Sequence, residues 1–72
     1  MSMTITFARN LLHLRKEKGW SQDMTARKLY VSRQLLGFIE QGKASVSLRV
    51  VERTCTVFEV DLIAMTQTDM AA

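Results

Sequence analysis

The chain contains no proline and only three glycines, at positions 19, 37 and 42, so little interrupts a regular backbone. The apolar residues can therefore be followed almost from end to end, and their spacing is helical throughout. Phe7, Leu11 and Leu14, for example, fall at i, i+4 and i+7, which places them on one face of a helix. The spacing predicts an all-α fold of five helices with no strand.

Capping residues divide the chain into these five helices. The first spans about residues 6–18 and ends at Gly19, which follows the basic residues Lys16 and Lys18 as is typical of a helix C-terminus. The third helix ends at Gly42. Each later helix has an N-cap candidate whose short polar side chain can accept a hydrogen bond from a free backbone amide. These candidates are Ser21, Ser32, Ser47 and Asp61.

Seventy-two residues allow a single small domain, 1–72, with a core over about residues 6–66 and a tail at 67–72 that is expected to fray. No apolar run approaches the roughly 18 to 20 residues of a membrane-spanning helix. Residues 1–7 lack the basic region ahead of an apolar stretch that marks a secretion signal. We therefore expect a cytoplasmic protein that does not contact a membrane.

The sequence offers few residues that could form a metal site or a catalytic site. His13 is the single histidine and Cys55 the single cysteine, so an internal disulfide is excluded and a structural zinc site, which takes about four such ligands, is not expected. No acid, base and nucleophile converge in the predicted helices. We expect no metal, no cofactor, no small-molecule ligand and no enzymatic activity.

Basic residues concentrate in the first two-thirds of the chain. The net charge is +3 and the sequence pI is about 9.5. Residues 9–43 hold eight basic side chains against three acidic ones, a balance of +5, whereas residues 44–72 hold two against four, a balance of −2. This distribution fits solvated helix faces as well as an anionic partner, so charge alone does not decide between them.

The segment from Ser21 to Gln41 is the most informative part of the chain. It contains two short helices, each with a serine cap, joined by a connection of about three residues. This is the sequence form of a helix-turn-helix, in which the second helix enters the major groove of DNA and the first lies across the backbone. The helices are too short to share the seam of a long bundle, so we expect them to cross at steep angles.

Four segments carry a family pattern in one register: LRKEKGWSQ at residues 14–22, Ala26, Val31-Ser32-Arg33 and IEQGK at residues 39–43. With these segments the chain resembles the lambda-repressor-like helix-turn-helix domains, also called the Xre or Cro/CI family, over about residues 7–65. The resemblance implies a compact five-helix DNA-binding domain whose second and third helices form the helix-turn-helix.

The resemblance also assigns contact residues. Four residues of the third helix would face base edges in the major groove: Arg33, Gln34, Gly37 and Phe38. Arginine suits the O6 and N7 acceptors of guanine, and glutamine suits N6 and N7 of adenine. Five residues around this helix would contact DNA phosphates: Gln22, Ser32, Gln41, Lys43 and Ser45.

Several of these assignments have a structural alternative. Ser32 is as well suited to cap the third helix as to bind a phosphate, and we favour the cap. Gly37 either allows close approach of the DNA or is tolerated without function. Phe38 either contacts a thymine methyl group or is partly buried under the following loop. A loop lysine such as Lys43 is often merely solvated, although its place in the family pattern favours phosphate contact.

The resemblance pairs Arg15 of the first helix with Glu40 at the end of the third, which would fix the third helix in place. Two positions depart from the family pattern in the core. Thr25 and Thr54 stand where a leucine is usual, which leaves a smaller and more polar core unless Met24 or a hydroxyl hydrogen bond compensates.

Three further departures lie at helix boundaries. Tyr30 and Glu59 replace glycines at left-handed helix ends, which costs strain or forces a different turn. Val46 replaces a proline before the fourth helix. Together these departures indicate a marginally stable monomer that association would stabilise.

The leading hypothesis is a sequence-specific double-stranded DNA-binding transcriptional regulator, a repressor or controller. One recognition helix reads only a few base pairs, so we expect a homodimer on a two-fold symmetric operator, with Val50, Leu62 and Met65 as interface candidates. The alternative is an antitoxin-like interaction module whose main role is to bind a partner protein. The sequence does not choose among phage repressors, Cro-like proteins, restriction-modification controllers and antitoxins.

Overall fold

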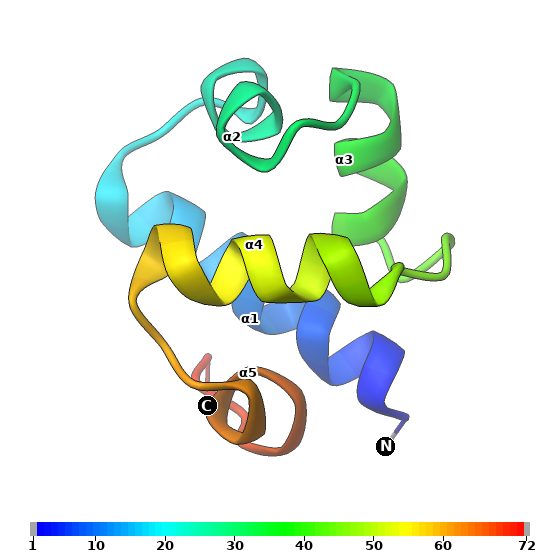
Figure 1. The fold of residues 1–72 in the computed structure, drawn as a ribbon, viewed down its shortest axis with the longest axis vertical. Coiled ribbons are helices and arrows are strands. Elements are labelled where there is room, and N and C mark those ends of the chain that lie inside the picture. Colours follow the sequence, from blue (N-terminus) through cyan, green and yellow to red (C-terminus); the bar gives the residue numbers. More distant parts are fainter. Residues whose placement is uncertain (1, 72) are drawn as a thin grey trace.

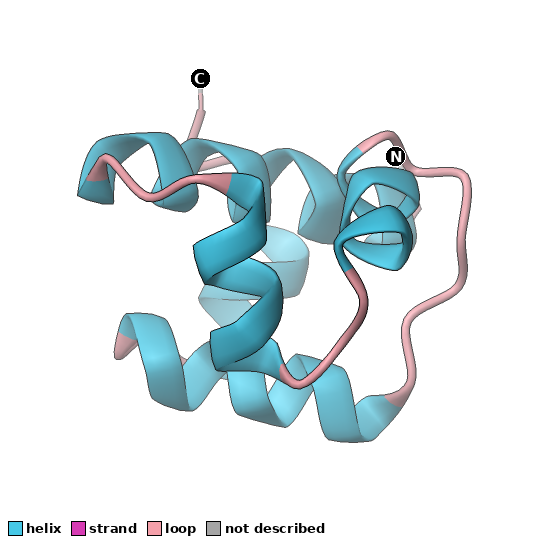
Figure 2. Cartoon of the chain, turned by 90° about the horizontal axis from the view of Figure 1, so that it is seen from above, coloured by secondary structure: helices cyan, strands magenta, loops and turns pink. Residues whose placement is uncertain are grey.

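A computed structural model describes residues 2–71, which form five α-helices and no strand in that range (Figures 1 and 2). The helices are α1 (Met3–Lys18), α2 (Gln22–Leu29), α3 (Arg33–Glu40), α4 (Leu48–Phe58) and α5 (Leu62–Gln67). The all-α prediction is confirmed. α1 begins earlier than predicted because the Ser2 hydroxyl caps it, accepting a hydrogen bond from the Ile5 amide at 3.2 Å. No helix within residues 2–71 is long and apolar enough to cross a bilayer.

The four predicted N-caps are all formed. The side chains of Ser21, Ser32, Ser47 and Asp61 accept hydrogen bonds from the backbone amide three residues on, at 3.0, 3.0, 3.3 and 2.8 Å respectively. Gly19 ends α1 in the left-handed conformation, with φ of 71°, as predicted. Gly42 also has a positive φ, of 72°, and directs the chain away from the end of α3. Local chemistry therefore sets most helix boundaries.

α1 packs against α5 and α3, whereas α4 packs against α2 and α5. α4 crosses in front of α1, the pair α2 and α3 lies at one end of the molecule, and α5 packs against α1 at the other end (Figure 1). Apolar side chains from all five helices meet between them. This core consists of Phe7, Leu11, Ala26, Leu29, Leu36, Ile39, Phe58 and Met65.

Thr25 and Thr54, which stand where the family has leucines, are both fully buried. The Thr25 hydroxyl donates to the carbonyl oxygen of Ser21 at 2.9 Å, and the Thr54 hydroxyl donates to that of Val50 at 2.8 Å. Each hydroxyl is thus paired within its own helix. The core is smaller than a leucine core, but neither threonine leaves an unpaired polar group.

Asn10 holds the segment that follows α5. Its side chain is fully buried, and its Nδ2 donates to the carbonyl oxygens of Met65 at 2.8 Å and Thr68 at 2.7 Å, while its Oδ1 accepts from the Met70 amide at 2.9 Å. An ion pair of 3.1 Å between Arg9 and Asp69 lies beside it. The segment predicted to fray is therefore bonded to α1 as far as residue 70, through a polar side chain whose position the helical pattern does not reveal.

Candidate nucleic-acid interface

α3 divides its side chains between the core and the solvent. Leu36 and Ile39 are buried, as their spacing predicts. The side chains of Arg33 and Gln34 are exposed on the first turn, and Phe38 is 43% exposed one turn later. Because the Ser32 hydroxyl caps the helix, the turn that carries Arg33 and Gln34 is fixed.

Two further features of this face bear on the predicted contacts. A methyl group added at Gly37 would meet no neighbouring atom within 4 Å, so the glycine is not required by packing in the free protein. Leu35, which is not among the predicted contact residues, is 37% exposed. Its signal in the sequence is indirect: assigning Leu36 and Ile39 to the core leaves position 35 outside.

The loop between α3 and α4 lies close to the end of α3. The backbone amide of Lys43 donates to the carbonyl oxygen of Phe38 at 2.9 Å, and Gly42 donates to that of Ile39 at 3.0 Å. The side chains of Gln41, Lys43 and Ser45 are exposed on this loop. The predicted phosphate-binding loop is thus anchored to the helix whose first turn carries Arg33.

Basic side chains on this part of the molecule differ in whether they are already paired. Arg27 forms an ion pair with Asp23 at 3.0 Å within α2. Among residues 2–71, neither Arg33 nor Lys43 has an ion pair. Both cations are therefore available to an anionic ligand at no cost in broken ion pairs.

Glu40, the last residue of α3, joins three helices. Its side chain is 4% exposed and accepts hydrogen bonds from Arg15 of α1, with Nε to Oε2 at 2.6 Å and Nη2 to Oε1 at 3.3 Å. The Arg15 Nη1 also donates to the carbonyl oxygen of Trp20, at 3.0 Å. The pair implied by the family resemblance is formed.

Gln22, predicted to bind a phosphate, also meets this pair. Its Nε2 donates to Glu40 Oε1 at 2.9 Å. The carboxylate therefore holds the first residue of α2 as well as the end of α1. This contact between residues 18 positions apart has no signal in the helical pattern.

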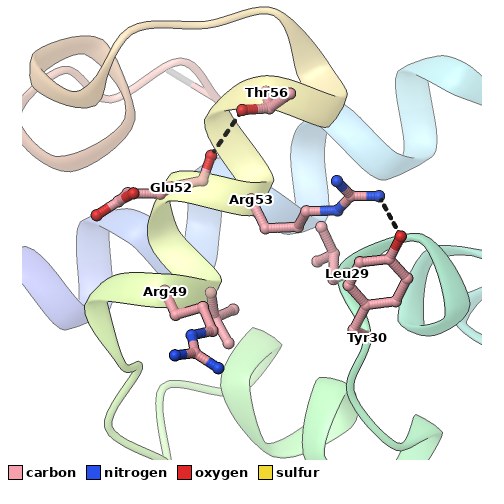
Figure 3. Close-up of a pocket in the computed structure, with 7 residues that line it drawn as sticks. Leu29, Tyr30, Arg49, Glu52, Arg53 and Thr56 are labelled. Atoms are coloured by element: carbon pink, nitrogen blue, oxygen red, sulfur yellow. Dashed lines mark hydrogen bonds between the residues drawn. The ribbon is translucent and has the colours of Figure 1, made fainter.

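A groove of about 370 Å³ lies between the turn after α2 and the helix α4 (Figure 3). It is lined by Leu29, Tyr30, Arg49, Val50, Glu52, Arg53 and Thr56.

Tyr30 is left-handed, with φ of 59°, and Glu59 is left-handed with φ of 56° at the end of α4. The chain thus keeps the left-handed helix ends at both positions where the family has glycine, instead of adopting a different turn.

A family model described as a helix-turn-helix domain matches residues 6–67. The chain belongs to this helix-turn-helix domain family. The lambda-repressor-like helix-turn-helix fold implied by the sequence is thereby confirmed. None of the curated proteins compared with the chain matches it by sequence.

The chain is also similar to solved structures of regulatory proteins. The restriction-modification controller protein C.AhdI from Aeromonas hydrophila is 27% identical, with a TM-score of 0.77, over 86% of this chain and 94% of its own. A transcriptional regulator of the HTH_3 family from Vibrio cholerae is 31% identical, with a TM-score of 0.78, over 93% of this chain but 38% of its own. The clp gene regulator ClgR from Corynebacterium glutamicum, with a TM-score of 0.85 over 99% of this chain and 76% of its own, is 18% identical and supports the fold alone.

The cysteine of this helix-turn-helix domain is not activated as a nucleophile. Burial raises the pKa of the Cys55 thiol, and the negative charge of Asp61 raises this pKa further. The thiol therefore stays protonated at neutral pH, whereas a reactive cysteine needs a lowered pKa. Within residues 2–71, no three metal-binding side chains come together.

The interface candidates of the helix-turn-helix domain fall in different environments. Leu62 is 48% exposed, and its neighbour Ile63, which is not among the predicted interface residues, is 65% exposed. Val50 is half-buried and lines the groove between the turn after α2 and α4. The prediction of Met65 as an interface residue is wrong, because its side chain is 0% exposed and packs in the core, where it offers no surface to a partner.

Proposed function

We propose that the protein is a sequence-specific double-stranded DNA-binding transcriptional regulator, a repressor or controller, that inserts α3 into the major groove. The observation that carries this proposal is the first turn of α3, where the exposed side chains of Arg33 and Gln34 project from a capped helix. Membership of the helix-turn-helix family supports it independently.

The exposed face of α3 reads base edges. Arg33 has donors for O6 and N7 of guanine, and Gln34 can bond N6 and N7 of adenine, each such pair giving about 1–3 kcal/mol of discrimination. Phe38 lies one turn further along and packs against a thymine methyl group. Gly37 leaves room for the wall of the groove to approach the helix backbone.

Phosphate contacts flank this face. Lys43 provides the charge, and Gln41 and Ser45 provide further polar groups from the same anchored loop. Ser32 acts first as the cap of α3, and a phosphate contact from its hydroxyl is secondary. Gln22 contacts a phosphate from the start of α2, where its amide bonds the end of α3. These contacts orient the domain but carry no sequence information themselves.

The domain acts as a homodimer on a two-fold symmetric operator, because one recognition helix reads too few base pairs for useful specificity. Half-sites of such an operator lie about 34–36 Å apart, or a multiple of this distance. The exposed side chains of Leu62 and Ile63 on α5 provide apolar surface for the second copy. Val50 is a further candidate from α4.

Selection of bound duplexes from a random pool tests this proposal, followed by titration of the selected duplex at several salt concentrations. We expect an enriched site with two-fold symmetry and an affinity that falls steeply with salt, because bound phosphates release counterions. An affinity with neither sequence preference nor salt dependence would contradict the regulator and favour the antitoxin-like interaction module.

A further inference from the structure

We infer that Glu40 is a positioning residue for DNA binding, because its buried carboxylate fixes the direction in which Gln22 presents its side-chain amide to DNA. This inference rests on the proposed function and deepens it. It assigns to the buried Arg15–Glu40 pair a role at the DNA surface in addition to its role in packing.

The chemistry of Glu40 leaves one orientation for the Gln22 amide. A carboxylate only accepts hydrogen bonds, so the group that faces it must be the Nε2 of Gln22 and not its Oε1. The observed distance from Nε2 to Glu40 Oε1 is 2.9 Å. Rotating the amide by half a turn would place the Gln22 Oε1 against an oxygen of the Glu40 side chain, which is only 4% exposed. A hydrogen bond to an ionised carboxylate is also stronger than one between neutral groups.

This orientation determines which hydrogen of the Gln22 amide is available to DNA. The amide nitrogen carries two hydrogens, and the one not bonded to Glu40 points about 120° away from the first. Gln22 is the first residue of α2 and follows the cap Ser21, so it belongs to the same helix end as the free backbone amides of the first turn. All of these groups are donors, which is what a phosphate oxygen requires.

Arg15 makes the arrangement compatible with an anionic ligand. A buried carboxylate near DNA would repel phosphates, but Arg15 contacts both oxygens of Glu40, at 2.6 and 3.3 Å, and balances its charge. The three side chains therefore act as one unit in which Arg15 neutralises, Glu40 orients and Gln22 contacts. Because the Gln22 side chain is already ordered in the free protein, binding does not have to immobilise it. The entropy saved corresponds to about 3- to 10-fold in affinity.

A double-mutant cycle tests the role of Glu40. The dissociation constant for the selected duplex is measured for the wild type, Gln22→Ala, Glu40→Gln and the double variant. We expect Glu40→Gln to weaken binding about 3- to 10-fold when Gln22 is present and less than 2-fold in the Gln22→Ala background. Glu52→Gln, the same chemical change at an exposed position on α4, serves as the control and should show no coupling to Gln22.

Equal losses in both backgrounds would overturn the inference, since a purely structural role of Glu40 does not depend on Gln22. Thermal melting of each variant shows whether the fold is retained. If Glu40→Gln does not fold, NMR of the wild type decides: we expect the Gln22 side-chain amide to be more ordered than that of the exposed Gln34. Equal mobility of the two amides would contradict the inference.

The outcomes also separate this inference from the proposed function. A wild-type protein that binds no duplex contradicts the regulator, and the inference falls with it. Salt-dependent, sequence-specific binding with additive losses in the cycle contradicts the role of Glu40 alone.

Discussion

Arg53 of α4 stacks on the ring of Tyr30, with its guanidinium carbon 4.3 Å from the ring centroid, and donates a hydrogen bond from Nη2 to the tyrosine hydroxyl oxygen at 2.9 Å. The Nε of Arg53 also donates to the carbonyl oxygen of Lys28 near the end of α2, at 3.0 Å. Figure 3 shows the two side chains side by side at the groove. A side chain in the left-handed region costs about 1–2 kcal/mol, and these contacts offset that cost at Tyr30.

Glu59 has the same backbone conformation without such compensation. Its side chain is exposed and makes no hydrogen bond or ion pair within residues 2–71. We predict that Glu59→Gly stabilises the domain by about 1 kcal/mol, because glycine adopts this conformation without strain. Urea denaturation at neutral pH measures the change. Gly19→Ala, the reverse substitution at a φ of 71°, should destabilise by a similar amount, and a loss of stability in Glu59→Gly would contradict the prediction.

Tyr30→Gly should not give the same gain. The substitution removes the strain but also removes the stacking and the hydrogen bond with Arg53, so we expect a smaller change than that of Glu59→Gly. Arg53→Ala should lower the free energy of unfolding by about 1 kcal/mol in the wild type and by less in the Tyr30→Gly background. Denaturation of the wild type, the two single variants and the double variant measures this coupling. Equal effects of Arg53→Ala in both backgrounds would show that the two side chains act independently.

Gly37 distinguishes the demands of folding from those of DNA binding. A methyl group at this position has open space, so Gly37→Ala should stabilise α3 by about 0.5–1 kcal/mol. The same methyl group would stand between the helix backbone and the groove wall, and we expect weaker DNA binding despite the more stable fold. Thermal melting and duplex titration measure the two effects. Unchanged affinity would remove Gly37 from the base-reading face.

Arg33 and Lys43 separate base reading from phosphate binding. We predict that Arg33→Ala costs about 1–3 kcal/mol on the preferred duplex and relaxes preference at one base position of each half-site. Lys43→Ala should weaken binding to all duplexes alike and reduce the salt dependence by about one phosphate contact. Titrations on matched and altered duplexes over a range of salt provide the comparison. The same salt dependence and the same specificity in the two variants would refute this division of roles.

A charged substitution on α5 tests whether its exposed apolar side chains form the dimer interface. Ile63→Lys places a cation on an exposed apolar side chain, and we predict that it weakens self-association at least tenfold, because pairing two copies would bury the added charges. Sedimentation equilibrium measures the association. Leu48→Lys, at an equally exposed position on α4, is the matched control and should leave association unchanged. Retained dimers of Ile63→Lys would place the interface elsewhere.

The features that could be predicted from the sequence are those with local causes. Ser21 and Ser32 were predicted as caps because a capping side chain bonds an amide three residues away. The contacts that escaped prediction join distant residues: Asn10 with the end of the chain, and Gln22 with Glu40. In a sequence these polar residues look the same as solvated ones, since only the packed fold shows which side chains they face.

Met65 illustrates a second limit. It lies in a six-residue helix, which is too short for its apolar pattern to separate an inner from an outer face. The structure places it in the core and leaves Leu62 and Ile63 outside. The family pattern, in contrast, supplied the Arg15–Glu40 pair, which has no local signal at all.

The hydrogen bonds of Asn10 join residues that are 55, 58 and 60 positions apart. Contacts of such long sequence separation carry a cost in loop-closure entropy, because most of the chain has to be closed into a loop before they yield any stabilisation. During synthesis the amide of Asn10 therefore has no partner until nearly the whole domain has left the ribosome. α1 packs against α5 as well as α3, so its part of the core is complete only once α5 is in place.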